Sequence, residues 1–386
     1  MSANALYDLS PTLRLLIMAL LLASGPLLMV HLRTRRAAPL GRVHALAMVS
    51  LFLTFDLVLF GAFTRLTDSG LGCPDWPGCY GSASPLGANE AISAAQQSMP
   101  TGPVTQGKAW VEMVHRYLAM AVGVLIIVLT VVAWLGQRQR GARPTGRTLW
   151  ATFTLVWVCV QGLFGALTVT MKLYPAIVTL HLLGGYVLLG LLMVQVTQLE
   201  KKSPGQTRLG LPGSLRGWIA AALLVLMLQA ASGAWVSTNY AVLACSDFPT
   251  CQGSWWPLMD FEQGFQIWRP LGLTQDGVHI SFQALTSIHF VHRVLAMGTL
   301  LVLGCLSVVL WGYSTLHSQA RALAAFLALQ LLTGLSNVLF DWPLLAAVLH
   351  TGGAGAMVVV LVGLLARTQS QSLEERAHAF SRRMSE

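Results

Sequence analysis

Charged residues are scarce in this sequence. Only 10% of the 386 residues are Asp, Glu, Lys or Arg, whereas 55% are hydrophobic, and the mean hydropathy is +0.63. Soluble domains are roughly a quarter charged. The composition therefore excludes an ordinary soluble domain and predicts an all-α integral membrane protein surrounded by membrane lipid.

The N-terminus lacks the marks of a cleaved leader. The first apolar run, residues 12–32, has no basic segment before it and no Ala-x-Ala-like cleavage site after it, both of which a secretory signal carries. We therefore expect a retained extra span. No organelle-type leader is apparent either, which favours a bacterial inner membrane.

Eight stronger apolar runs follow, and each is long enough to cross a hydrocarbon core of roughly 30 Å as a helix. They cover residues 44–65, 110–135, 148–170, 175–197, 216–237, 284–312, 320–340 and 343–366. The sequence thus predicts eight core spans in a multi-pass protein.

The loops between these runs divide by charge. Residues 33–42, 138–147 and 201–216 and the C-terminal tail are rich in Arg and Lys, whereas residues 67–109 and 238–283 hold few basic residues. Positively charged loops stay in the cytoplasm, so we place the two long loops on the periplasmic side. This distribution also accounts for the net charge of +9 without a nucleic-acid partner.

Three groups of residues recur at nearly constant spacing. Cys73 and Cys79 recur 172 residues later, Glu112 and His115 recur as His289 and His292 after 177, and a third group recurs after 169: Gln161, Gly165 and His181 as Gln330, Gly334 and His350. A repeat of four spans returns the chain to its starting side. The repeats therefore predict two parallel four-helix bundles related by a pseudo-two-fold axis along the membrane normal.

This pattern predicts five parts of the chain. They are an N-terminal segment and basic loop (1–43), a first bundle (44–199), a cytoplasmic linker (200–215), a second bundle (216–366) and a cytoplasmic tail (367–386).

Four histidines lie at one depth in the predicted spans: His115, His181, His292 and His350. At 1.5 Å per residue they lie roughly 8 to 10 Å inside the periplasmic ends. A hydrogen bond between helices explains one such histidine, but four in two repeated pairs indicate a function. Axial ligation of a haem iron is the chemistry that suits an inward-facing histidine pair in a four-helix bundle.

One position breaks the repeat. Glu112 lies three residues before His115, on the same helical face, whereas His289 occupies the matching place before His292. An acid within lipid is costly unless it is protonated, paired or functional. We therefore expect the first bundle to perform chemistry and the second to store or pass electrons. The role of His289 itself stays open.

Four cysteines lie in the two long loops as Cys-x5-Cys pairs, Cys73 with Cys79 and Cys245 with Cys251. An oxidising compartment favours a disulfide in each loop. A redox-active pair that exchanges with a thiol carrier is an alternative. A zinc site built from all four is a third, although the usual Cys-x2–4-Cys spacing is absent.

Three arginines lie near the predicted sites: Arg65, Arg116 and Arg293. Each has two interpretations, because it can extend to lipid headgroups or pair with a haem propionate. The sequence does not separate them.

The segment 61–79, Gly-Ala-Phe-Thr-Arg-Leu-Thr-Asp-Ser-Gly-Leu-Gly-Cys-Pro-Asp-Trp-Pro-Gly-Cys, closely resembles the first-loop signature of the haem A synthase family. The His115, His181, His292 and His350 segments follow in that family's order, and the resemblance spans residues 44–366. It implies oxidation of the C8 methyl of haem O to a formyl group by successive hydroxylation with water-derived oxygen, which gives haem A for terminal oxidases.

The resemblance also implies roles for individual residues. His115 and His181 match the ligands of the substrate haem iron, and His292 and His350 match the ligands of a haem b cofactor. Glu112 matches an acid that removes a proton or stabilises a cationic intermediate. Haem O is the implied substrate, haem O synthase and a second copy of the chain are candidate partners, and the electron acceptor is not identified.

Two other functions compete with this one. A bis-histidine b-type cytochrome that only transfers electrons explains the histidines but not Glu112 or the loop segment. A transporter with parallel repeats would bind its substrate at mid-membrane, whereas the polar residues here gather near one face.

Overall fold

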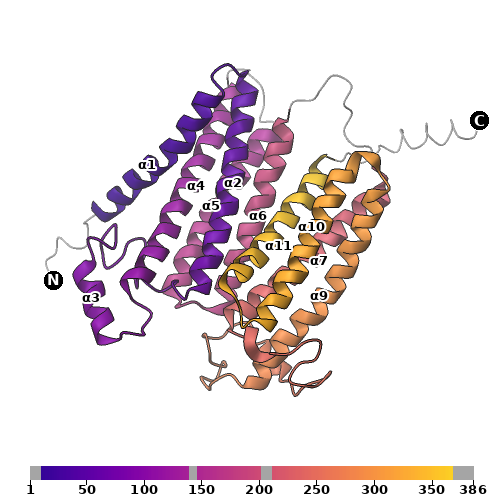
Figure 1. The fold of residues 1–386 in the computed structure, drawn as a ribbon. Coiled ribbons are helices and arrows are strands. Elements are labelled where there is room, and N and C mark those ends of the chain that lie inside the picture. The colour runs from indigo at the N-terminus through magenta and orange to yellow at the C-terminus, as the bar shows by residue number, and fades with distance from the viewer. Residues whose placement is uncertain (1–9, 139–145, 201–210, 368–386) are drawn as a thin grey trace, which may run out of the picture.

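The computed structural model describes residues 10–138, 146–200 and 211–367 (Figure 1). Nine helices in these ranges are long and apolar enough to cross a membrane, and the described residues form no β-strand beyond isolated bridges. The predicted all-α membrane fold is therefore confirmed. Parts of the basic loops and nearly all of the predicted tail lie outside the described residues.

The first bundle consists of α2 (Pro39–Leu66), α4 (Gln106–Arg138), α5 (Gly146–Thr170) and α6 (Pro175–Leu199). Each helix packs against the next, and α6 packs back against α2, so the four close a ring. The helices α4 and α6 lie diagonally across this ring. The extra helix α1 (Ser10–Arg33) packs outside it, against α4 and α2.

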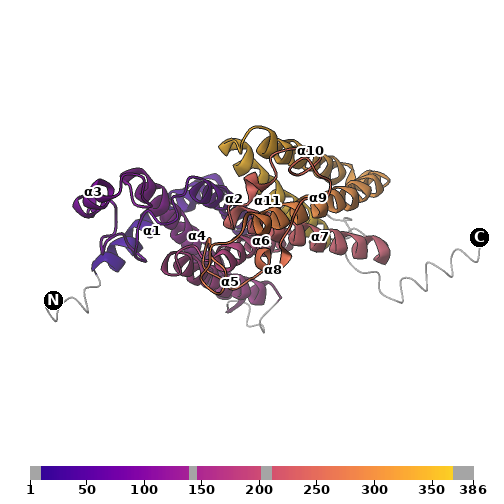
Figure 2. The same cartoon turned by 90° about the horizontal axis from the view of Figure 1, so that it is seen from below.

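The second bundle repeats this arrangement with α7 (Gly213–Thr238), α9 (Phe282–Trp311), α10 (His317–Leu339) and α11 (Leu344–Arg367). Here α11 packs back against α7, and α9 lies diagonally across from α11. The view along the helices shows the two groups side by side (Figure 2). The predicted pair of four-helix bundles is confirmed.

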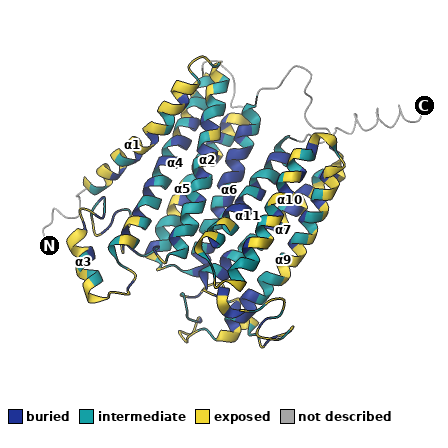
Figure 3. Cartoon of the chain, viewed as in Figure 1, coloured by how far each residue is buried: buried dark blue, intermediate teal, exposed yellow. Residues whose placement is uncertain are grey.

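The bundles meet along α6 and α11, and α2 and α7 complete the interface. Tyr186 of α6 is buried there, and its hydroxyl donates a hydrogen bond to the carbonyl oxygen of Thr351 on α11 at 2.7 Å. Gly355 faces the same ring, because a Cβ at Gly355 would lie 3.2 Å from Tyr186 Cε1. Many residues of the outer helices are exposed (Figure 3). They include large apolar side chains such as Leu301 and Val308 of α9, as expected of a lipid-facing surface.

Local sequence explains where the helices that carry the histidines begin. Pro175 occupies the first turn of α6, where its missing N–H costs nothing. Ser281 caps α9 by accepting a hydrogen bond from the Ala284 N–H, and Thr105 accepts one from the Lys108 N–H at the start of α4. These features mark where α4, α6 and α9 begin, and with them the depth of His115, His181 and His292.

Both long loops lie at one end of the molecule (Figure 1). The first contains the short helix α3 (Asn89–Ser98), and the second contains α8 (Phe261–Gly264). A disulfide joins Cys73 to Cys79 and another joins Cys245 to Cys251, as predicted. All four thiols are thereby engaged, which leaves none of them free to ligate zinc.

Candidate functional site

The first pair of predicted ligands projects from helices that face each other across the first ring. His115 is on α4 and His181 is on α6, the two helices that lie diagonally across this ring. Each ring lies over a glycine of a neighbouring helix. A Cβ at Gly61 would lie 3.0 Å from His115 Nε2, and one at Gly165 would lie 3.5 Å from His181 Cε1.

The second pair has the same arrangement. His292 is on α9 and His350 is on α11, which lie diagonally across the second ring of helices. A Cβ at Gly233 would lie 2.9 Å from His292 Cε1, and one at Gly334 would lie 3.3 Å from His350 Cε1. Four imidazoles thus lie over four glycines that are themselves repeat partners.

This donor set fits a haem in each bundle. Two imidazoles from opposite helices can supply both axial nitrogens to one iron. The glycines leave room beside each ring. A Cβ would crowd the imidazole at Gly61, Gly233 and Gly334, and at Gly165 it would lie in van der Waals contact with it. The described residues contain no group of three or more His, Cys, Asp or Glu side chains suited to a bare metal ion. A histidine pair is therefore the candidate metal site in each bundle.

Glu112 connects the first site to its loop. The Cys73 N–H donates a hydrogen bond to Glu112 Oε2 at 2.8 Å, and Arg116, one turn further along α4, pairs with the other carboxylate oxygen. Gly72 permits this contact, because its Cα packs directly on the α4 backbone, where a Cβ would clash. Only 4% of the Glu112 surface is exposed. The acid therefore lies buried between its helix and the disulfide loop.

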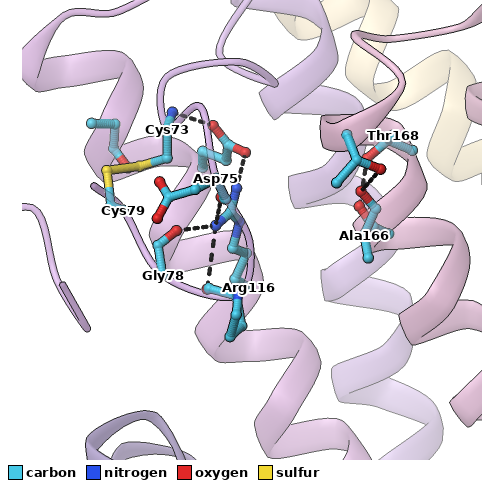
Figure 4. Close-up of polar contacts among 12 residues, drawn as sticks. Cys73, Asp75, Gly78, Cys79, Arg116, Ala166 and Thr168 are labelled. Carbon is cyan, nitrogen blue, oxygen red and sulfur yellow. Dashed lines mark hydrogen bonds and ion pairs between the residues drawn. A yellow bond between two sulfur atoms is a disulfide. The ribbon is translucent and has the colours of Figure 1, made fainter. Parts of the chain in front are cut away.

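Arg116 organises the Cys73–Cys79 loop from below. Its Nη1 donates to the carbonyl oxygens of Asp75 at 2.9 Å and Pro77 at 3.2 Å, and also to that of Gly78 (Figure 4). A buried guanidinium that satisfies several carbonyls and a carboxylate ties the helix firmly to the loop. This contact set extends inward to the loop rather than outward to lipid.

The second bundle replaces the carboxylate with an imidazole. His289 Nε2 accepts a hydrogen bond from Arg293 Nε at 3.3 Å. Arg293 also donates to the carbonyl oxygens of Cys245, Asp247 and Thr250, at 2.6 to 2.9 Å. The imidazole of His289 is thus directed at its loop arginine, whereas the ring of His292 lies beside Gly233.

Arg65 joins the two bundles at the loop end. Its Nη2 donates to the carbonyl oxygen of Ser237 at 2.6 Å, and its guanidinium lies 4.0 Å from the centre of the Tyr240 ring. Asp68 accepts hydrogen bonds from both Arg65 and the Tyr240 hydroxyl. The propionate contacts predicted for Arg65, Arg116 and Arg293 stay predictions.

Sequence reasoning missed several residues around the histidines. Ser232 and Thr333 contact the imidazoles of the second bundle, each at 2.9 Å from Nδ1. The sequence did contain a signal for them. Each is a hydroxyl residue in an apolar span, and phenylalanine occupies the matching position of the first repeat. Arg269 was also missed, because nothing in its loop sequence shows that it folds into the protein and bonds Asn239.

Comparison with known proteins gives consistent matches across the spans. Residues 44–362 match a family model described as cytochrome oxidase assembly protein. A haem A synthase of Shewanella oneidensis is 34% identical over 317 residues, which cover 82% of this chain and 94% of that protein. Haem A synthases of Halalkalibacterium halodurans and Caulobacter vibrioides are 28% and 26% identical, over 76% and 80% of this chain and 86% and 90% of their own lengths.

Proposed function

Because the chain belongs to the cytochrome oxidase assembly family that includes the haem A synthases, we propose that it converts haem O to haem A for terminal oxidases. The reaction oxidises the C8 methyl of haem O to a formyl group. With water as the oxygen source, each methyl and one water give one formyl group, four protons and four electrons. The site must therefore hold the substrate, accept protons and pass electrons on.

The first bundle carries the reaction in this proposal. His115 and His181 hold the substrate haem iron, and Glu112 lies one turn of α4 from His115. The observation that carries the proposal is that only this histidine pair has a buried acid beside it, since His289 takes the place in the second bundle. A buried carboxylate is suited to take up a proton or to stabilise positive charge near the methyl.

The contacts of Glu112 support this role. Arg116 compensates its charge, and the Cys73 N–H orients one carboxylate oxygen. The disulfide keeps the loop closed above the acid, which limits the access of bulk water. Redox cycling of the cysteines is not needed for this function.

The second bundle holds a haem b through His292 and His350. A resident haem supplies a one-electron carrier beside the reacting site. We choose His292 over His289 because His289 Nε2 already accepts a hydrogen bond from Arg293, whereas His292 lies over a glycine as the other three histidines do. The inner membrane is the proposed location, with the disulfide loops in the oxidising periplasm.

Replacing Glu112 with Gln tests the proposal. The amide keeps the size and can still bond Cys73 N–H, but it cannot take up a proton. We expect purified E112Q protein to keep its haem b, while cells that depend on it make no haem A. The measurement is pigment extraction and chromatography of haems. Normal haem A from E112Q would overturn the role of Glu112. A wild-type protein that yields only protohaem would instead indicate a plain electron-transfer cytochrome.

A further inference from the structure

The two histidine pairs differ in what surrounds their Nδ1 atoms. In the second bundle, Ser232 Oγ of α7 lies 2.9 Å from His292 Nδ1, and Thr333 Oγ1 of α10 lies 2.9 Å from His350 Nδ1. Ser232 immediately precedes Gly233, the glycine beside His292, and Thr333 immediately precedes Gly334, the glycine beside His350. The contact is thus the same in both halves of the second site.

Each hydroxyl also reaches a carbonyl oxygen of its own helix, and we assign the donors in these contacts from that. Ser232 Oγ donates to the Gln229 carbonyl at 2.8 Å, and Thr333 Oγ1 donates to the Leu329 carbonyl at 2.7 Å. A hydroxyl has one proton, so each oxygen is left to accept from Nδ1–H. Gln229 Nε2 lies 3.1 Å from the same Nδ1 and 3.3 Å from the His292 carbonyl oxygen, and we assign its N–H to the carbonyl. With these assignments, both imidazoles are the tautomer whose Nε2 lone pair is free to bind iron.

The first bundle has no counterpart to these hydroxyls. Phe60 stands at the repeat position of Ser232, and Phe164 at that of Thr333. The Phe60 ring stacks on His115, with ring centres 6.4 Å apart and planes 8° from parallel. The buried Nδ1 of His181 has no hydrogen-bond partner among the described residues. In the first bundle, therefore, an aromatic ring lies beside His115, and the Nδ1 of His181 lacks the hydroxyl contact that His350 has.

We infer that Ser232 and Thr333 are positioning residues that make the second bundle a site of haem retention, whereas Phe60 and Phe164 keep the first bundle a site of haem exchange. A hydrogen bond accepted from Nδ1–H fixes the ring orientation and makes Nε2 a stronger donor, and losing such a partner typically weakens metal binding about 10- to 100-fold. A catalytic site must release its product, haem A, and release is faster where this hydrogen bond from Nδ1–H is absent. The inference rests on the proposed function, which assigns one bundle to substrate and the other to cofactor.

Removing the hydroxyls tests the retention half. We expect S232A and T333A to release haem b to a haem-scavenging apoprotein about 10-fold faster each, and the double variant faster still. The midpoint potential of haem b should rise, because a less electron-rich imidazole stabilises the ferric state less. The conservative variants S232T and T333S should restore both values. T299A is the matched control, since Thr299 of α9 bonds only its own helix, to the Leu295 carbonyl.

Introducing hydroxyls tests the exchange half. F60S and F164T should make the first bundle hold its haem, so that purified protein carries more haem A or haem O per chain and releases it more slowly. L163T is the control, because Leu163 lies next to Phe164 but faces outward with 58% of its surface exposed. Unchanged release rates and potentials in S232A/T333A, with haem b bound normally in the wild type, would overturn the inference. Wild-type protein without haem b would overturn the proposed function instead.

Discussion

Single residues at the loop end of the helices act mainly by satisfying backbone atoms. Arg116 and Arg293 looked from sequence like lipid or propionate contacts, yet each donates to three carbonyls of the disulfide loop above it. The sequence did identify the residues: Glu112, the cysteines and the arginines were all singled out from the repeat. It could not identify their partners, because a loop conformation, and not residue spacing, decides which carbonyls a guanidinium meets.

Asp247 gives a pH prediction at this scale. The Thr250 hydroxyl and the N–H groups of Gly253 and Gln252 bond its carboxylate and lower its pKa from 3.8 to about 2. Because the pKa is lower in the folded loop, the ionised carboxylate stabilises the fold at pH values above 3.8, the pKa of the unfolded chain. This stabilisation is lost as the pH falls through about 2. We expect pepsin to cut the Cys245–Cys251 loop more readily at pH 2 than at pH 4, relative to an unstructured substrate.

The variant D247N supplies the control for this experiment, because its amide does not titrate in that range. Its loop should be cut equally readily at both pH values after the same correction. A wild-type loop that shows no change between pH 4 and pH 2 would contradict the prediction.

At the scale of helices, hydropathy predicted the spans well and their ends less well. The run 175–197 corresponds closely to α6, Pro175–Leu199. Pro175 begins both the apolar run and the helix, and the helix ends two residues after the run. By contrast, α2 starts at Pro39, five residues before the run 44–65, since a helix continues past the apolar core where polar side chains reach water. The helices α3 and α8 were not predicted, because they are short and lie in polar loops.

The glycines under the histidines were only partly foreseen. Gly165 and Gly334 appeared in the repeat, but nothing in the sequence showed that they face His181 and His350. That pairing depends on how neighbouring helices rotate against each other, which single-helix periodicity does not fix. The pairing of the histidines within each bundle, in contrast, was predicted from the repeat together with their equal depth.

Replacing Gly233 with alanine should affect the stability of the helix and the binding of haem differently. Replacing a helical glycine with alanine usually stabilises a helix by about 0.8–1 kcal/mol. In G233A, however, the new Cβ would lie 2.9 Å from His292 Cε1 and would displace the ring. We expect G233A to lose the low-spin haem b spectrum while its helical content is unchanged.

Gly217 is the matched control, since it lies on the same helix, α7, with nothing within 4 Å of its Cβ position. G217A should keep its haem and gain thermal stability. The haem-to-protein ratio and the melting curve measure both effects. A full complement of haem b in G233A would contradict the close packing described for His292.

At the scale of the whole molecule, the bundles are joined at three levels. Arg65 bonds the Ser237 carbonyl at the loop end, Tyr186 bonds Thr351 in the interior, and Arg367 Nε donates to Glu200 at 3.1 Å at the opposite end. In two of these joints, a residue contacts its own repeat position, as expected close to the predicted pseudo-two-fold axis. Arg65 bonds Ser237, which lies 172 residues later, and Tyr186 packs on Gly355, which lies 169 residues later. The sequence predicted the axis and one break in the repeat, Glu112 against His289, but it did not show which residues join the two bundles.

The ring of Tyr186 fills the space left by its repeat partner, Gly355. The contact is therefore asymmetric, since tyrosines at both positions would collide. We expect Y186F to cost about 1 kcal/mol, since it removes one buried hydrogen bond and keeps the ring. Y186A should cost about 3–5 kcal/mol, since it also leaves a cavity between α6 and α11. Reversible unfolding in detergent measures both values. F153A is the control, because Phe153 is a large aromatic residue of α5 with 48% of its surface exposed. If Y186A unfolded no more easily than F153A, the Tyr186 joint would not hold the two bundles together.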